Sequence, residues 1–222
     1  MHKALNIILS TIALSSCAYT STDNEAHTEI PASKIKLQTF VYECPDDFNF
    51  VARIETNRAW IFLPGNTIDL PQVPSASGTK YSNGSDTFWS KAGEAMIETG
   101  KDKHAGCRNN RARAIWEHAK LNGVDFRALG NEPGWYMEIS NRHDILLVTD
   151  YGQRKYNFTS SVIKSPPDSR TTIYNASNDD SMIEVVIKGE PCRDSMSGEA
   201  FSATVSVVVN DKRYTGCGKA LH

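Results

Sequence analysis

Short stretches of alternating apolar and polar residues run along the first half of the chain, starting at Leu37. In one of them Phe48, Phe50, Ala52 and Ile54 fall on one face of an extended strand, because successive side chains of a strand point to opposite faces. Turn residues separate these stretches. Six to eight short strands at this spacing predict an antiparallel β-barrel or sandwich.

One segment has the periodicity of a helix. Asn109-Asn110 precede the run R-A-R-A-I-W-E-H-A-K-L, and Gly123 follows it as a stop signal. We expect this helix to join two β-domains. Its buried face is predicted to contain Ala112, Ile115 or Trp116, and Ala119.

Beyond the helix the pattern returns to short strands, and Asn210-Asp211 predicts a two-residue turn between the last two. The fold class is therefore all-β, with two small antiparallel barrel or sandwich domains joined by one short helix. The predicted division is a signal peptide (1–16), a tether (17–36), a β-barrel (37–108), a linking helix (109–123) and a second β-domain of unknown function (124–222).

The hairpin around Asn83-Gly84 is the most informative part of the first domain. Asn-Gly favours a type I′ turn with positive φ at both central residues, which would pair Ser82 with Ser85 and Ser77 with Ser90. The serine would then lie one step from Lys91. We therefore expect a hydroxyl and an ammonium group to be neighbours at this end of the hairpin.

The N-terminus has the pattern of an export signal. Lys3 precedes an apolar run, Ala4 to Leu14, that is too short to span a bilayer, and the run ends in L-S-S-C. This ending resembles a bacterial lipobox, which implies that Cys17 is acylated, with palmitate among the acyl chains. Ala18 after it implies an outer-membrane lipoprotein facing the periplasm. The alternative is an ordinary signal peptide with Cys17 as a plain thiol.

Four cysteines remain if Cys17 is lipidated: Cys44, Cys107, Cys192 and Cys217. In an exported protein such cysteines form disulfides, and four cysteines allow three connectivities. The sequence alone does not choose, but pairing within each half is preferred because each bond then closes one domain. Zinc is the rival interpretation, and neither C-x-x-C nor a close histidine pair supports it. No metal or cofactor is expected.

The charge is distributed unequally. Residues 17–107 contain 8 Lys and Arg against 12 Asp and Glu, a net of −4, whereas residues 108–222 contain 15 against 14, a net of +1. An acidic first half favours encounter with a cationic partner, although a charge this small is equally typical of a solvated surface.

Several motifs of the first half resemble the membrane-bound inhibitors of c-type lysozyme. The resemblance covers roughly residues 38–107 and rests on Y42-x-C44, S75-A-S77-G78-x-K80-Y81, F88-W89-x-K91 and Cys107. It implies a small β-barrel and a lysozyme-binding site at Ser77, Gly78, Tyr81 and Lys91. By this resemblance Ser77 supplies a hydroxyl and Lys91 an ammonium group to the two catalytic carboxylates of the lysozyme. Gly78 gives the backbone room to turn, and Tyr81 supports the loop.

One position departs from the family pattern. The resembling proteins more often have glycine directly after the lysine, whereas here Ala92 separates Lys91 from Gly93. The local backbone conformation is therefore an open question at the sequence level.

The second half resembles an uncharacterised exported family, over roughly residues 111–219. The resemblance rests on the stretches F126–W135, E190–S197 and G216-C-G218. Glu132-Pro133-Gly134-Trp135 could mark a ligand site, but Pro-Gly is foremost a turn and a tryptophan at the start of a strand is usually part of a core. The structural interpretation is preferred.

Three classes of function compete. The leading hypothesis is a lipid-anchored binding protein whose partner is a c-type lysozyme. An enzyme is disfavoured because the chain has no G-x-S-x-G elbow, no phosphate loop and no metal spacing. The alternative is a wall-binding envelope lipoprotein without inhibitory activity, in which tryptophans stack on sugars (Trp60, Trp89, Trp116 and Trp135). Nucleic acid is not an expected partner, and a homodimer is left open.

Overall fold

The computed structural model describes residues 37–222. The predicted signal peptide, the lipidation site Cys17 and the tether lie outside the described residues. The described chain is almost entirely β-structure, with one α-helix and one short 3₁₀ turn, as the sequence predicts. Within this range no helix is long and apolar enough to cross a membrane.

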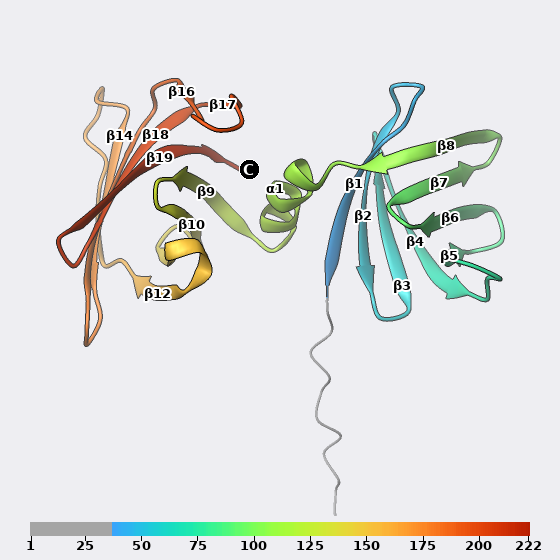
Figure 1. Ribbon diagram of the computed structural model, residues 1–222, viewed down its shortest axis with the longest axis horizontal. Coiled ribbons are helices and arrows are strands. Elements are labelled where there is room, and N and C mark those ends of the chain that lie inside the picture. Colours follow the sequence, from blue (N-terminus) through green and yellow to red (C-terminus); the bar gives the residue numbers. More distant parts are fainter. Residues whose placement is uncertain (1–36) are drawn as a thin grey trace, which may run out of the picture. The chain divides into compact units, whose positions relative to one another are not determined.

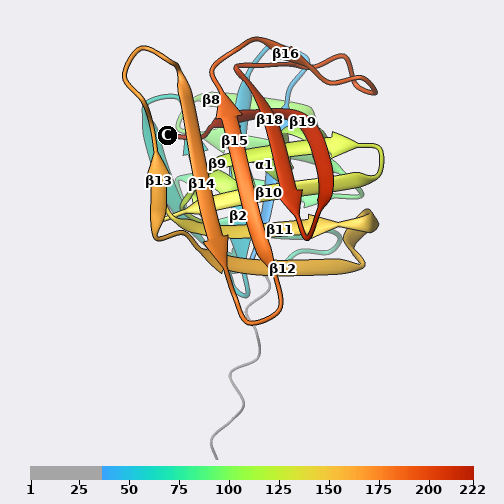
Figure 2. The ribbon, with the colours of Figure 1, turned by 90° about the vertical axis from the view of Figure 1, so that its left-hand side faces the viewer.

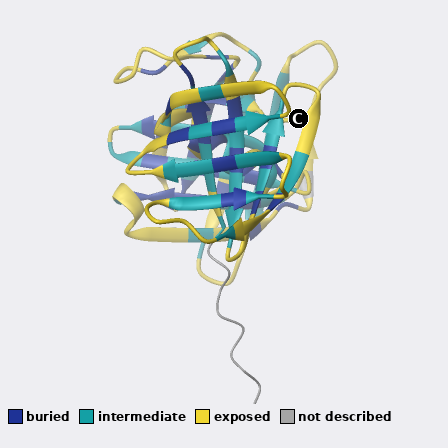
Figure 3. Cartoon of the chain, turned by 90° about the vertical axis from the view of Figure 1, so that its right-hand side faces the viewer, coloured by how far each residue is buried: buried dark blue, intermediate teal, exposed yellow. Residues whose placement is uncertain are grey.

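The first half forms a closed antiparallel barrel in which the strands follow one another in sequence order (Figure 1). Its strands are β1 (Gln38–Glu43), β2 (Asn49–Glu55), β3 (Arg58–Leu63), β4 (Asn66–Val73), β5 (Thr79–Ser82), β6 (Asp86–Lys91), β7 (Glu94–Thr99) and β8 (Asp102–Asn109). Figure 3 shows buried and half-buried positions along these strands and exposed turns at their ends.

The barrel core confirms the alternation seen in the sequence. Phe50 and Ala52 are buried, and Phe48 and Ile54 pack against the same cluster. The aromatic rings of Tyr42, Phe50 and Phe88 meet at its centre, with centroids 5.2 to 5.9 Å apart. Burying aromatic surface of this size contributes strongly to the stability of so small a domain.

The seam that closes the barrel is short. Strands β1 and β8 pair only at Tyr42–Asn109 and Glu43–Arg108. Two further links lie beside this seam, the disulfide Cys44–Cys107 and a hydrogen bond from the Asn110 amide to the Val41 carbonyl (2.7 Å). The disulfide is the pairing preferred from the sequence, and it reinforces a seam in which only two residue pairs are formed.

The β5–β6 hairpin differs from the predicted two-residue turn. Ser82 pairs with Thr87 rather than Ser85, and Asn83 does not adopt the left-handed conformation that a type I′ turn requires. Instead the Asn83 side chain caps a longer loop, since its Oδ1 accepts hydrogen bonds from the amides of Ser85 (3.0 Å) and Asp86 (2.8 Å). The predicted register was therefore wrong by two residues.

Helix α1 (Arg111–Leu121) begins at Asn110, whose side chain accepts a hydrogen bond from the Arg113 amide. Its buried residues are Ala114, Trp116 and Ala119. The prediction was thus right for Ala119 and for Trp116, the second of the alternatives Ile115 and Trp116, and wrong for Ala112, which is exposed. The buried face is set by Trp116, which packs against Phe201 with ring centroids 5.2 Å apart.

The second half forms a nine-stranded antiparallel sheet in the order β12-β11-β10-β9-β19-β18-β15-β14-β13. In Figure 2 strands β14, β15 and β18 run steeply in front of β9 to β12, which cross behind them, so the sheet curls over its own core. The strands are β9 (Val124–Asn131), β10 (Gly134–Ser140), β11 (Asp144–Thr149), β12 (Arg154–Thr159), β13 (Val162–Lys164), β14 (Thr171–Ser177), β15 (Met182–Lys188), β18 (Ala203–Val209) and β19 (Lys212–Ala220).

Smaller elements complete this half. The 3₁₀ turn η1 (Asp150–Gly152) joins β11 to β12, and β16 (Cys192–Arg193) pairs with β17 (Ala200–Phe201) beside the main sheet. The predicted turn at Asn210-Asp211 is confirmed, since both residues have positive φ (46° and 65°) and Val209 pairs with Lys212.

The barrel is expected to fold without the second half, because it has its own closed ladder, core and disulfide. We predict that a fragment of residues 33–110 unfolds cooperatively and that reducing Cys44–Cys107 lowers its free energy of unfolding by about 2–5 kcal/mol. Urea denaturation followed by circular dichroism, with and without reductant, measures both. A fragment that shows no cooperative transition would contradict the proposed boundary.

Candidate functional site

The predicted site lies on the loop between β4 and β5. Residues 74–78 of this loop are exposed, and Ser77 lies at its end just before β5. Two prolines restrict the backbone here, because the ring of each fixes φ. Pro71 lies in β4, and Pro74 lies at the start of the loop. The loop is therefore short, stiff and nearly free of bulky side chains.

Three hydrogen bonds hold Ser77. Its carbonyl accepts from the indole Nε1 of Trp89 (2.9 Å) and from the Ser75 hydroxyl (2.8 Å). Its Oγ accepts from the Lys91 Nζ at 3.4 Å. The structure thus brings Ser77 and Lys91 together, as the sequence predicts, although it does so by curving the loop over β6 rather than by extending the ladder.

Gly78 makes this curvature sterically feasible. Its φ is +67°, in the left-handed region that favours glycine. A Cβ at this position would lie 2.4 Å from the Ser90 carbonyl oxygen and 3.0 Å from the Lys91 Cβ. Any other residue would push the loop away from β6, and with it the Ser77 hydroxyl from the Lys91 ammonium group.

Lys91 ends β6 and is exposed, directly before the turn to β7. Its cross-strand neighbour Glu94 pairs with Arg108 (3.2 Å) rather than with the lysine. Within residues 37–222 no carboxylate forms an ion pair with the Lys91 ammonium group. The charge at the edge of the site is therefore available to a partner.

The turn after Lys91 shows which backbone conformation the chain adopts at Ala92, where the resembling proteins more often have glycine. Ala92 has φ +50° and Gly93 has φ +85°, so both adopt the left-handed conformation of a two-residue hairpin turn. Alanine thus takes the backbone conformation for which glycine is better suited. The direction of Lys91 is kept at some cost in conformational energy.

Tyr81 is placed in the barrel core rather than at the surface. It is 3% exposed and stacks on Phe88 with ring centroids 5.9 Å apart, and burial raises the pKa of its hydroxyl. Tyr42 lies deeper, where burial raises its pKa to about 12 despite a hydrogen bond with Ser90. Both tyrosines pack against β5 and β6 from inside the barrel. Tyr81 can therefore position the loop, but its buried side chain is not accessible to a partner.

Trp89 is the site residue that sequence reasoning missed. It belongs to the motif F88-W89-x-K91 and was considered only as a core residue or a platform for sugars. The structure uses its indole N–H to hold the Ser77 carbonyl. The alternation of side chains along β6 could have indicated this role. Phe88 is buried, so Trp89 faces outward, on the same side of the strand as Lys91.

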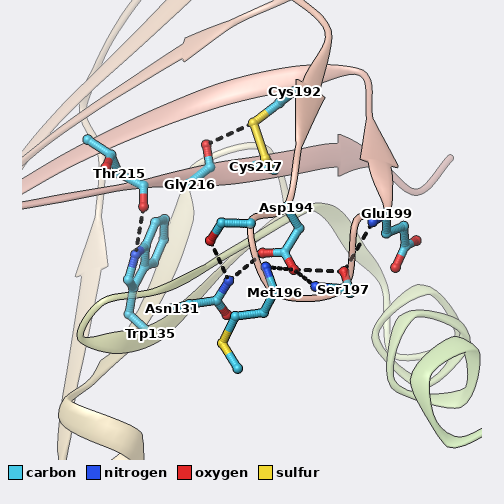
Figure 4. Close-up of a disulfide and its surroundings, with 11 residues drawn as sticks. Asn131, Trp135, Cys192, Asp194, Met196, Ser197, Glu199, Thr215, Gly216 and Cys217 are labelled. Carbon is cyan, nitrogen blue, oxygen red and sulfur yellow. Dashed lines mark hydrogen bonds between the residues drawn. A yellow bond between two sulfur atoms is a disulfide. The ribbon is translucent and has the colours of Figure 1, made fainter.

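The three marked stretches of the second half also meet. Figure 4 shows Asn131, Trp135, Asp194 and Gly216 gathered around the Cys192–Cys217 disulfide. Trp135 is 5% exposed and donates its indole N–H to the Thr215 carbonyl (3.2 Å). The interpretation of Glu132–Trp135 as a turn followed by a core residue fits this placement.

The described residues contain no group of three or more histidine, cysteine, aspartate or glutamate side chains arranged to hold a metal ion. Ser77 and Lys91 present one hydroxyl and one ammonium group on a surface where several hydrogen bonds hold the loop.

Comparisons with known proteins agree with the motifs of the first half. Residues 42–105 match the family model described as membrane-bound lysozyme-inhibitor of c-type lysozyme. A curated relative from Yersinia enterocolitica, named membrane-bound lysozyme inhibitor of C-type lysozyme, is 36% identical over 64 residues. The match covers 28% of this chain and 55% of the relative. No solved structure matches the chain. Residues 42–105, which form most of the barrel, are therefore similar to the membrane-bound lysozyme inhibitors.

Proposed function

We propose that the protein is a lipid-anchored inhibitor of a c-type lysozyme and not an enzyme itself. The observation that carries this proposal is the pairing of an exposed Ser77 hydroxyl on a stiff loop with an exposed Lys91 ammonium group at the end of β6, 3.4 Å away. The similarity of residues 42–105 to lysozyme inhibitors supplies the class of partner.

The chemistry of the target suits these two groups. A lysozyme cleft contains two carboxyl groups about 5 Å apart, one protonated as the general acid and the other ionised. The Ser77 hydroxyl can hydrogen-bond one of them, and the Lys91 ammonium group can form a charge-assisted hydrogen bond with the other. An inhibitor that occupies both leaves neither free to act on a glycosidic bond.

The stiffness of the loop supports tight binding. Hydrogen bonds from Trp89 and Ser75 fix the Ser77 carbonyl, and Gly78 seats the loop on β6. Little conformational freedom then remains to be lost on association, so more of the contact energy contributes to affinity. The net charge of −4 over residues 17–107 favours encounter with a cationic lysozyme and acts mainly on the association rate.

The location follows from the N-terminal pattern. We propose that Cys17 is acylated and that the protein is held at the outer membrane, facing the periplasm, where it meets lysozymes that enter the envelope. Lys3, the short apolar run and L-S-S-C support this placement.

Replacing Ser77 by Ala or Lys91 by Ala should each weaken lysozyme binding by roughly 2 kcal/mol or more. The physical reason is that a carboxyl group of the lysozyme is then left without its partner in a desolvated cleft. Lys91→Ala should also reduce the salt dependence of binding. Surface plasmon resonance at two salt concentrations, together with a cell-wall turbidity assay, measures both effects.

Lys101→Ala is the matched control, because Lys101 is an exposed lysine at the opposite end of β7, in the turn to β8. It should bind lysozyme as the parent does. If both site variants inhibit as well as the parent, the loop is not the binding site.

Trp89→Phe tests the positioning of Ser77. The ring is kept but the indole N–H to the Ser77 carbonyl is lost, so inhibition should weaken about three- to tenfold, the effect of one hydrogen bond of about 1 kcal/mol. The melting temperature should change little, because Trp89 is only half-buried.

Gly78→Ala should weaken inhibition further, since its Cβ displaces the loop. Inhibition unchanged in both variants would show that loop geometry is irrelevant.

Anchoring is tested by mass spectrometry of the mature protein extracted from membranes. We expect an N-terminal peptide that begins at Cys17 and carries acyl chains, and we expect Cys17→Ser to release the protein from the membrane fraction. An unacylated N-terminus at another residue would refute the lipid anchor.

A further inference from the structure

A groove lies on the outer face of the second sheet, beside the Cys192–Cys217 disulfide. Its volume is about 440 Å³, within the usual size of ligand sites. Strand pairing defines its floor. Lys188 faces Thr204, and Thr204 faces Cys217, so these side chains lie on one face of three adjacent strands.

A second row runs parallel to the first on the same face. Val186 faces Ser206, and Ser206 faces Thr215. At the far side of the floor Asn131 of β9 faces Gly134 of β10. Hydroxyl and amide side chains therefore dominate the floor, which combines them with a few apolar groups.

The loop of residues 193–199 forms a fixed wall. The disulfide ties its start to β19, and the Asp194 carboxylate accepts hydrogen bonds from the Ser197 amide and hydroxyl, both 2.7 Å, and from the Met196 amide (Figure 4). The Asn131 side chain also donates to Asp194. These donors, those of Ser197 foremost, lower the pKa of Asp194, so its negative charge is stabilised within the wall.

The available charge in the groove is positive. Within residues 37–222 the Lys188 ammonium group has no ion-pair partner, and the hydroxyls of Thr204 and Thr215 have no hydrogen-bond partner. Arg193 is exposed at the rim and donates one guanidinium N–H to the Gly198 carbonyl. The groove thus combines free hydroxyls with a free cation at the β15 end.

An exposed aromatic ring lies just beyond the Asn131 end of the groove, outside the residues that line it. Tyr151 is 78% exposed, and its ring occupies the space where a side chain at position 134 would lie, 2.7 Å from an ideal Cβ on Gly134. Because Gly134 faces Asn131, the ring lies next to the amide that contacts the wall. Ion pairs of Asp150 with Lys212 (3.0 Å) and Arg154 (3.4 Å) hold the turn that presents Tyr151.

We propose that this groove binds an acidic oligosaccharide. Tyr151 stacks on a sugar ring at one end, the threonine hydroxyls and Asn131 bond to ring hydroxyls, and Lys188 pairs with a carboxylate at the other end. From β10 to β15 the floor spans four strand spacings, about 19 Å, which suits several linked sugars rather than one. The inference concerns the second half of the chain and does not rest on lysozyme inhibition by the barrel.

Two tetrasaccharides, long enough to reach from Tyr151 to Lys188, test the proposal by calorimetry on the full chain. The first consists of two linked N-acetylglucosaminyl-N-acetylmuramic acid units, which carry carboxylates, and the second is tetra-N-acetylchitotetraose, which carries none. We expect the acidic sugar to bind more tightly. Lys188→Ala should weaken binding of the acidic sugar by about tenfold, as expected for the loss of a charge-assisted hydrogen bond. It should leave the affinity for the neutral sugar unchanged.

Tyr151 separates stacking from charge. Tyr151→Ala should lower the affinity for both sugars, whereas Tyr151→Phe should bind both sugars as tightly as the parent does. Lys120→Ala is the matched control, because Lys120 is an exposed lysine of α1 outside the groove. None of these variants should alter lysozyme inhibition, which distinguishes failure of this inference from failure of the barrel's function.

The proposal is overturned if neither sugar binds at millimolar concentration, or if the two bind equally and Lys188→Ala changes neither. It is also overturned if Lys120→Ala weakens the acidic sugar as much as Lys188→Ala does, since the attraction would then be a long-range effect of net charge.

Discussion

The close approach of the Gly78 backbone to β6 is the contact on which the candidate inhibitory site depends. The missing Cβ leaves room for the Ser90 carbonyl oxygen, which would otherwise lie 2.4 Å away. Only at this separation can the Trp89 indole reach the Ser77 carbonyl and the Lys91 ammonium group reach the Ser77 hydroxyl. One atom absent from the loop thus sets the geometry of Ser77 in the loop and of two side chains on β6.

The hairpin shows which part of a site can be predicted from sequence. The expected register was wrong by two residues, because the Asn83 side chain caps a longer loop in place of a type I′ turn. A slip of two residues keeps every side chain on its original face, whereas a slip of one would have exchanged the faces. Phe88 therefore remains in the core and Lys91 at the surface. The predicted strand register was wrong, but the prediction that Lys91 lies next to Ser77 was correct.

In the second half the sequence indicated the right stretches but not their arrangement. Alternation predicted most of the strands, and spacing made Cys192 and Cys217 a plausible pair. The groove, however, depends on strand order, since β15, β18, β19 and β9 are adjacent in the sheet although β9 precedes the others by a long stretch of chain. No local pattern states that Lys188 and Tyr151 border one surface. Long-range pairing decides it, and single-sequence reasoning has little access to such pairing.

Both halves have a disulfide beside a short ladder. In the barrel, Cys44–Cys107 lies beside the two-pair seam between β1 and β8. In the second half, Cys192–Cys217 attaches a two-residue strand and its loop to the face of the main sheet. Hydrogen bonds alone would hold each of these segments poorly, because so few backbone groups are paired there. The bond in the barrel completes a closed core that supports the Ser77 loop from below. The bond in the second half fastens its segment to the sheet face, where the Asn131–Asp194 hydrogen bond also holds it. Each candidate surface thus lies next to one disulfide, a bond that persists in oxidising compartments.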